Sequence, residues 1–78
     1  MVIKIKYYGL IANNLISEVS IPEGSNVADL LIQLIKEEPK NGDMFNKATI
    51  LVNKKKADLN TILNDKDEVM ILTILGGG

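Results

Sequence analysis

The sequence contains no cysteine and no histidine. Without cysteine the chain has neither a disulfide nor a thiol nucleophile, and without histidine it lacks the side chain most often used as a general base. The usual protein ligands of zinc are missing for the same reason. These absences exclude zinc sites of the usual kind and catalysis by a thiol or an imidazole.

Arginine is also absent, and the net charge at pH 7 is −1. Proteins that bind nucleic acid normally present a basic, arginine-rich surface, so we expect no nucleic-acid partner. The one basic run, residues 54–56, is interpreted as a solvated turn. No apolar run approaches the roughly 18 residues of a membrane span, and the alternating start of the chain does not resemble a secretory signal. We therefore expect no membrane partner and a cytoplasmic location.

Alternation of apolar and polar side chains predicts two strands at the start of the chain. Residues 2–8 alternate apolar side chains with lysine, and residues 15–21 alternate again. Residues 9–14 contain one glycine and two asparagines and are expected to close a hairpin, which makes the strands antiparallel. The side chains expected to face the core are Ile3, Ile5, Tyr7, Leu15, Val19 and Ile21.

A helix is predicted over residues 26–37. Asn26 suits an N-cap, and Asp29 is placed to reach back to it as in a capping box. Pro39 cannot continue the helix, which therefore ends at residue 37 or 38. Residues 40–47 are interpreted as a polar loop that Phe45 pins to the core. The apolar stripe of the helix consists of Val27, Leu30, Leu31, Leu34 and Ile35.

The second half of the chain predicts a third strand over residues 48–53 and a last strand over residues 68–75. Between them, residues 59–63 suggest a short helical turn or a brief strand, and residues 64–67 form a turn. Both faces of the last strand are apolar, which fits a central strand. One of these faces has two interpretations, either core covered by residues 58–63 or a partner surface. Its members are Met70, Leu72 and Ile74.

A single amphipathic helix needs the face of one sheet to bury its stripe. The element order therefore predicts an α+β protein with a mixed sheet of four to five strands and one main helix. In this arrangement the first and last strands are adjacent and parallel, which is the β-grasp, or ubiquitin-like, fold. We expect one domain over residues 1–75, followed by a flexible glycine tail over residues 76–78.

Three segments resemble the small subunits of molybdopterin synthase, within the MoaD–ThiS family of ubiquitin-like sulfur carriers. They are GSNVADLL at the helix start, YYG in the first strand, and ILVNKKKADLNTILNDKDEVMILTILGGG, which runs to the end. The departures are Lys66-Asp67 where Gly-Asp is common, no proline before the tail, and three terminal glycines where two are usual. The chain is long for the thiamin branch of this family, so the molybdopterin branch is favoured.

The resemblance implies that the working group is the terminal carboxylate of Gly78, presented next to Gly77. An E1-like adenylyltransferase would activate it with ATP and convert it to a thiocarboxylate, whose sulfur passes to a pterin precursor in molybdenum or tungsten cofactor biosynthesis. The chain would bind no cofactor and would be no enzyme on its own, but the non-catalytic sulfur-donor subunit beside the molybdopterin-synthase large subunit. The implied partner interface is Met70, Leu72, Ile74, Leu75 and Gly76.

Two other functions use the same features of the sequence. A ubiquitin-like modifier would attach the terminal glycine to lysines of other proteins. A plain interaction module would carry an inert tail, in which case the glycines are only a disordered end or an expression scar.

Overall fold

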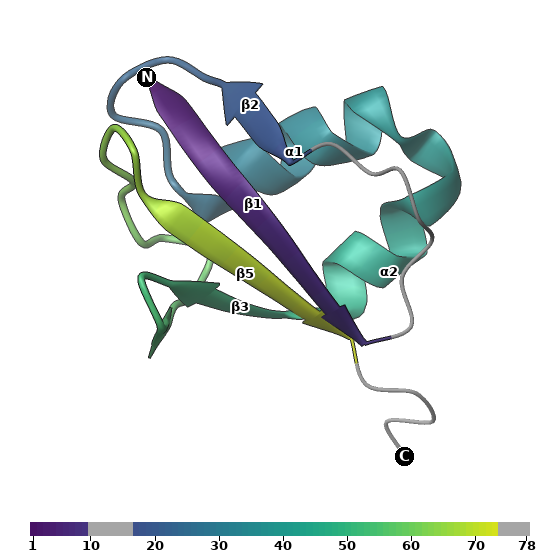
Figure 1. Cartoon of the computed structure of the whole chain (residues 1–78). Helices are drawn as coiled ribbons and strands as arrows, with labels where there is room; N and C mark the ends of the chain where they lie inside the picture. The colour runs from purple at the N-terminus through teal and green to yellow at the C-terminus, as the bar shows by residue number, and fades with distance from the viewer. Residues whose placement is uncertain (10–16, 74–78) are drawn as a thin grey trace.

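The computed structural model describes residues 1–9 and 17–73. In these residues, five strands form one sheet in the order β2-β1-β5-β3-β4 (Figure 1). The predicted hairpin loop, Leu15 and the glycine tail lie outside the described residues. The strands are β1 (Val2–Gly9), β2 (Glu18–Ser20), β3 (Thr49–Val52), β4 (Lys55–Lys56) and β5 (Glu68–Thr73). The helices are α1 (Val27–Glu37), a 3-10 turn η1 (Pro39–Asn41) and α2 (Gly42–Lys47).

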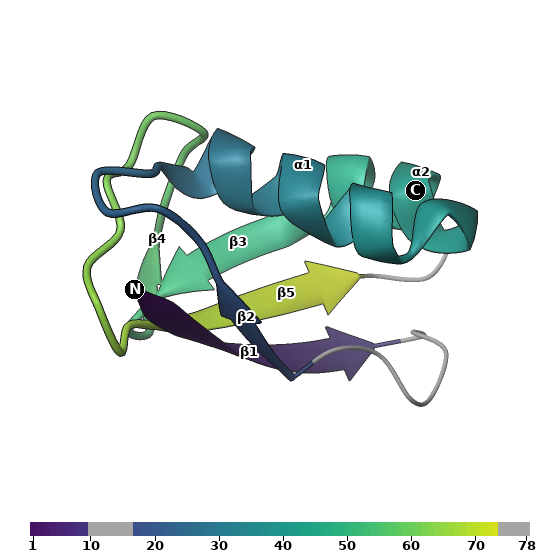
Figure 2. The same cartoon turned by 90° about the horizontal axis from the view of Figure 1, so that it is seen from above.

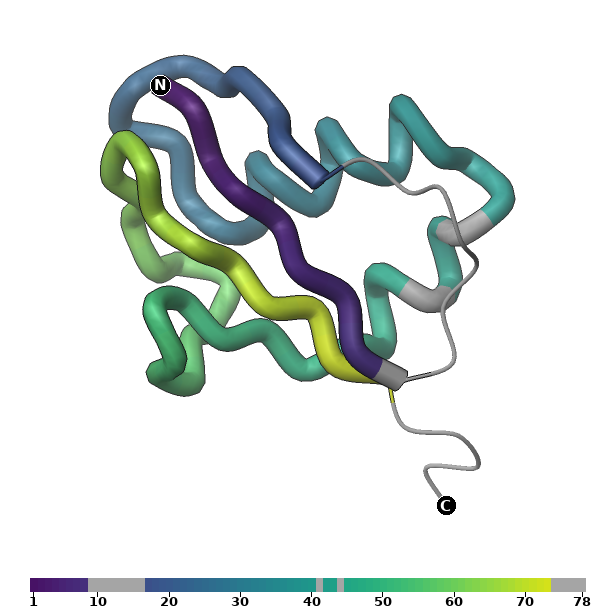
Figure 3. The backbone as a smooth tube through the Cα atoms, in the orientation of Figure 1, coloured from purple at the N-terminus to yellow at the C-terminus, as the bar shows by residue number. Residues whose placement is uncertain are grey.

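Strand β5 occupies the middle of the sheet, between β1 and β3. It pairs in parallel with β1 over six positions, from Lys4 opposite Glu68 to Gly9 opposite Thr73. Figure 3 shows these two segments, from opposite ends of the chain, running side by side in the same direction. On its other side β5 is antiparallel to β3. The predicted β-grasp, with its adjacent and parallel first and last strands, is confirmed.

Helix α1 begins at the predicted capping box. The Asn26 side chain accepts a hydrogen bond from the Asp29 backbone N–H at 2.9 Å, and the Asp29 carboxylate accepts one from the Asn26 N–H at 3.0 Å. These bonds satisfy N–H groups that the first helical turn leaves without partners. The predicted stripe faces the sheet: Val27, Leu30, Leu31 and Leu34 are buried, and Ile35 is partly buried against the core.

The interpretation of residues 40–47 as a loop is wrong, because they form the end of η1 and the helix α2. Six residues are too few for an apolar repeat to show in the sequence, and such a short helix depends on tertiary packing. Phe45 supplies that packing: it is 1% exposed, and its ring centroid lies 6.4 Å from that of Tyr7. Burial, and then the negative charge of Glu38, raise the pKa of Tyr7 to about 12.

Two smaller expectations also change. The turn after β3 lies at Asn53 and Lys54, both with positive φ, whereas Lys55 and Lys56 form the edge strand β4. Residues 59–63 are neither a helix nor a strand of the sheet. They contain a turn closed by the Thr61 N–H on the Asp58 carbonyl, and one isolated bridge between Ile62 and Asn26. No helix in the described part of the chain is long and apolar enough to cross a membrane.

Replacing Leu34 with alanine tests the packing of α1. Leu34 is fully buried, so the variant should lose about 2–5 kcal/mol of unfolding free energy through lost transfer energy and a cavity. Ile32 on the same helix is 65% exposed, and Ile32→Ala should change stability by no more than about 0.5 kcal/mol. Denaturant unfolding measures both. Equal losses in the two variants would mean that the helix presents a different face to the sheet.

Candidate functional site

The sheet has one covered face and one open face. Helices α1 and α2 lie on the same side of the sheet (Figure 2), over the face that carries the buried Val69 and Ile71. Among the described residues, no helix covers the opposite face. Strand register places four apolar or aromatic side chains together there, because residues paired across strands share a face. This open-face patch consists of Tyr8, Leu51, Met70 and Leu72.

The patch is accessible to a partner. Tyr8 is 47% exposed, and Leu51, Met70 and Leu72 are half-buried. Residues 58–63 do not cover it, because they lie beside the start of α1 on the other side of the sheet. There the Val27 N–H donates to the Thr61 carbonyl at 3.0 Å. Of the two interpretations of Met70 and Leu72, the structure therefore favours the surface over the covered core.

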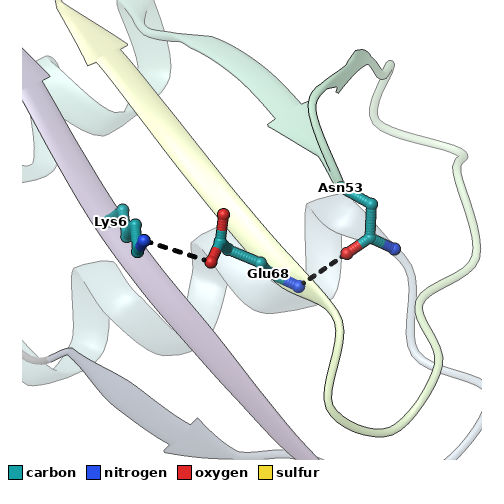
Figure 4. A network of polar contacts seen from close by, with 3 residues as sticks. All are labelled: Lys6, Asn53 and Glu68. Atoms are coloured by element: carbon teal, nitrogen blue, oxygen red, sulfur yellow. Dashed lines mark hydrogen bonds and ion pairs between the residues drawn. The ribbon is translucent and has the colours of Figure 1, made fainter.

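Charged side chains border the patch at the beginning of β5. The Lys6 Nζ atom lies 3.3 Å from the Glu68 carboxylate, an ion pair shown in Figure 4. Lys4 lies directly opposite Glu68 on the same face. The Lys6 side chain is 54% exposed, so this ion pair contributes at most about 1 kcal/mol to stability. Its effect is to separate the apolar end of the open face, toward Tyr8 and Leu72, from a charged end.

A hydrogen-bond network fixes the start of β5. Asn53 donates from Nδ2 to the Asp67 carboxylate at 2.9 Å. Its side-chain oxygen accepts the Glu68 N–H at 3.0 Å, a bond shown in Figure 4. The second oxygen of Asp67, a residue only 9% exposed, accepts the Asn64 N–H at 2.8 Å. The Asp67 carbonyl accepts the Lys4 N–H at 2.9 Å. The turns on both sides are thus tied to β5, which fixes the register of the strand.

That register determines where β5 ends. Thr73 is the last described residue, lies opposite Gly9, and donates from its hydroxyl to the Tyr8 carbonyl at 3.4 Å. Strand β5 therefore ends at the apolar end of the open face, one residue after Leu72. The remaining predicted site residues lie outside the described residues. They are Ile74, Leu75, Gly76, Gly77 and Gly78.

The open-face patch consists of three aliphatic side chains and one tyrosine, a composition that suits recognition by another protein. Among the described residues, no group of three or more potential metal ligands comes together. Sequence reasoning found Met70 and Leu72 but not Tyr8 and Leu51. Alternation already places Tyr8 with the lysines of β1 on the outer face, yet only the order of the strands shows that it lies next to Leu72.

Replacing Asn53 tests the network. Asn53→Ala removes both side-chain hydrogen bonds and places a Cβ-bearing residue without a polar side chain at φ 51°, so it should cost about 1–2 kcal/mol. A glycine at position 53 adopts that φ without strain but also lacks both side-chain hydrogen bonds. The difference in unfolding free energy between the two variants therefore isolates the cost of the backbone conformation. Denaturant unfolding is the measurement. A loss below about 0.5 kcal/mol in both variants would show that the network does not hold β5.

Comparison with known proteins identifies the family that the chain resembles in sequence. A sequence model described as the ThiS family matches residues 5–78. The molybdopterin synthase sulfur carrier subunit of Mycobacterium tuberculosis is 34% identical over 61 residues, which cover 78% of this chain and 74% of that protein.

Solved structures share the fold over the whole chain. The crystal structure of SAMP1 from Haloferax volcanii superposes with a TM-score of 0.82 at 20% identity, covering 100% of both chains. A complex of subunits 1 and 2 of the molybdopterin-converting factor from Helicobacter pylori contains a chain with a TM-score of 0.68 at 24% identity, again covering 100% of both. The family match and the mycobacterial relative show that this chain belongs to the ThiS family of ubiquitin-like sulfur carriers.

Proposed function

We propose that this protein carries sulfur as a thiocarboxylate on Gly78 and serves as the small subunit of a molybdopterin synthase. The observation that carries the proposal is the 34% identity to a molybdopterin synthase sulfur carrier subunit over most of both chains. The fold supports it, because the central strand β5 ends beside the open-face patch and the glycine-terminated segment follows at once. A partner that grips the patch would receive the end of the chain.

The chemistry requires little from this chain beyond its carboxylate. In the proposed reaction, an oxygen of that carboxylate attacks the α-phosphate of ATP in the activating enzyme, and pyrophosphate leaves. Hydrosulfide supplied by a partner then attacks the acyl carbon, AMP leaves and the sulfur loses its proton, which produces the thiocarboxylate. We assign the acid, base or metal that each step needs to the partner, because the chain has no cysteine or histidine and no basic cluster in the sequence beside its terminal glycines.

Glycine suits a chain end that must enter another protein's active site. It has no side chain, so a segment of glycines is thin enough for a narrow channel, and it adopts φ values that other residues avoid. Gly76, Gly77 and Gly78 supply three such residues in a row. Activation and sulfur delivery both need the carboxylate to reach a nucleotide or pterin site inside a partner.

The proposed partners are an E1-like adenylyltransferase and the molybdopterin-synthase large subunit. The Helicobacter pylori structure is a complex of subunits 1 and 2 of its molybdopterin-converting factor, and its similar chain supports a two-subunit assembly here. We place both partners on the open-face patch. Tyr8 and Leu72 lie opposite each other on β1 and β5, and we expect them to be the aromatic and aliphatic anchors of the interface. Leu75 and Gly76 would extend this interface along the tail.

A ubiquitin-like modifier remains the alternative function, because conjugation to lysine uses the same activated carboxylate. The fold shared with SAMP1 is compatible with either function. The two are distinguished by the product. A carrier yields free protein after sulfur transfer, whereas a modifier yields amide-linked conjugates that survive reducing gel electrophoresis.

Leu72→Lys tests the patch. A lysine there replaces an apolar anchor with a charge that must be desolvated, so affinity for the large subunit should fall by about 2 kcal/mol, or roughly thirtyfold. Ile32→Lys introduces the same charge at an exposed position of α1, on the helix side of the sheet, and serves as the matched control. Isothermal titration calorimetry measures both. Unchanged affinity for a correctly folded Leu72→Lys protein would remove the patch from the interface.

Deleting Gly77 and Gly78 tests the working group. The truncated chain should keep its melting temperature, because glycines have no side chains to bury, and should lose ATP–pyrophosphate exchange with the cognate activating enzyme. Extending the chain by one serine past Gly78 should abolish exchange as well, since the carboxylate is then displaced. Exchange at the normal rate by the truncated protein would refute the terminal carboxylate as the reacting group.

A further inference from the structure

The register of the sheet places a lysine on each side of the open-face patch. Residues that are paired across strands share a face, so the pairings of β1, β5, β3 and β4 define rows of side chains across the sheet. One such row on the open face consists of Lys6, Met70, Leu51 and Lys56, each paired with the next. A partner that covers the two apolar members of this row therefore comes close to both lysines.

The lysine on the β1 side has a counter-charge within this chain. The Lys6 Nζ atom lies 3.3 Å from the Glu68 carboxylate (Figure 4). Lys4 lies in the adjacent row between two acids, opposite Glu68 on β5 and opposite Glu18 on the edge strand β2. Two lysines and two glutamates thus share this side of the open face, and their charges cancel. The β1 side needs no further carboxylate from a partner.

The lysine on the β4 side has no such counter-charge. Lys56 is exposed, and in residues 1–9 and 17–73 no carboxylate lies within ion-pair distance of its amino group. The nearest acid along the chain, Asp58, is engaged in its own turn. One of its carboxylate oxygens accepts the Asn60 N–H at 2.9 Å and the Thr61 hydroxyl at 3.3 Å. The open face is therefore neutral on one side of its apolar patch and positive on the other.

We propose that the molybdopterin-synthase large subunit places a carboxylate against Lys56 when it covers the open-face patch. The inference rests on the proposed function, which assigns that subunit to the patch. Covering Met70 and Leu51 removes water from the side of Lys56 that faces them, and a charge that loses water is costly unless it gains an opposite charge or hydrogen bonds. An aspartate or glutamate of the partner would supply both.

This contact would also fix the direction in which the partner lies across the sheet. In one direction the partner's carboxylate meets Lys56. In the reversed direction it approaches the β1 side, where Glu68 and Glu18 already balance the lysines. Like charges brought together in an interface are unfavourable, so the reversed complex is disfavoured. Lys56 is thereby a specificity-determining residue of the interface, and the apolar side chains are its anchors.

Isothermal titration calorimetry of the full chain with its cognate large subunit tests the contact. Lys56→Glu replaces attraction with repulsion and should weaken binding at least about fivefold. Lys55→Glu is the matched control, because it changes the charge equally one residue earlier on β4. Lys55 is exposed and paired with Val52, on the helix-facing side of the sheet, so binding should stay within about twofold of wild type.

A third variant separates charge from packing. Lys56→Met keeps an apolar stem of similar length, so its affinity should lie between those of the wild type and Lys56→Glu, and it should depend less on salt than the wild-type affinity does. All three substitutions are at exposed positions, and the melting temperature of each variant should match that of the wild type.

The outcomes distinguish this inference from the proposed function. Equal affinities of the Lys55→Glu and Lys56→Glu variants would overturn the inference, because the effect would not depend on the face of the sheet. If Leu72→Lys weakens binding and Lys56→Glu does not, the large subunit binds the patch without the carboxylate contact, and the proposed function stands alone. Failure of the wild-type chain to bind the large subunit would overturn both.

Discussion

The parallel pairing of β1 with β5 is the interaction on which the rest of this structure depends. It joins the two ends of the sequence, so everything between them must form a crossover, at a cost in loop-closure entropy. Burial offsets that cost. Val69 and Ile71 are fully buried under α1, whose leucines cover the centre of the sheet. Without α1 the parallel pair would have no core, and without the pair α1 would have no surface to cover.

In the proposed function, the same pairing explains how a chain without cysteine or histidine would take part in group transfer. By placing β5 centrally, it gives the last strand a hydrogen-bonded neighbour on each side and ends that strand at Thr73, whose hydroxyl donates to the Tyr8 carbonyl. The network around Asn53 and Asp67 fixes where that strand begins, and therefore where it ends. The protein contributes a surface whose strands are held in register, and in the proposed function the partners contribute the reactive chemistry.

Strongly periodic segments could be predicted from the sequence, and features that depend on neighbours in space could not. The apolar stripe and the capping box predicted α1, and the alternation of side chains predicted β1 and β5. In each of these elements the side chains repeat with the period of the secondary structure. Helix α2 was missed because it is held by one buried ring, that of Phe45. Leu51 joined the open-face patch only once the strand order was known, since pairing across strands leaves no local signal.

The central claim, that the terminal carboxylate carries sulfur, is tested most directly by the intact mass of the protein isolated from its native cells. Replacement of one carboxylate oxygen by sulfur adds about 16 Da, and fragmentation should place that gain on Gly78. A fraction of the protein with this mass, lost on treatment with an alkylating agent that caps the thiocarboxylate, is the predicted result. Protein found only at its unmodified mass, in cells actively making the pterin cofactor, would contradict the account.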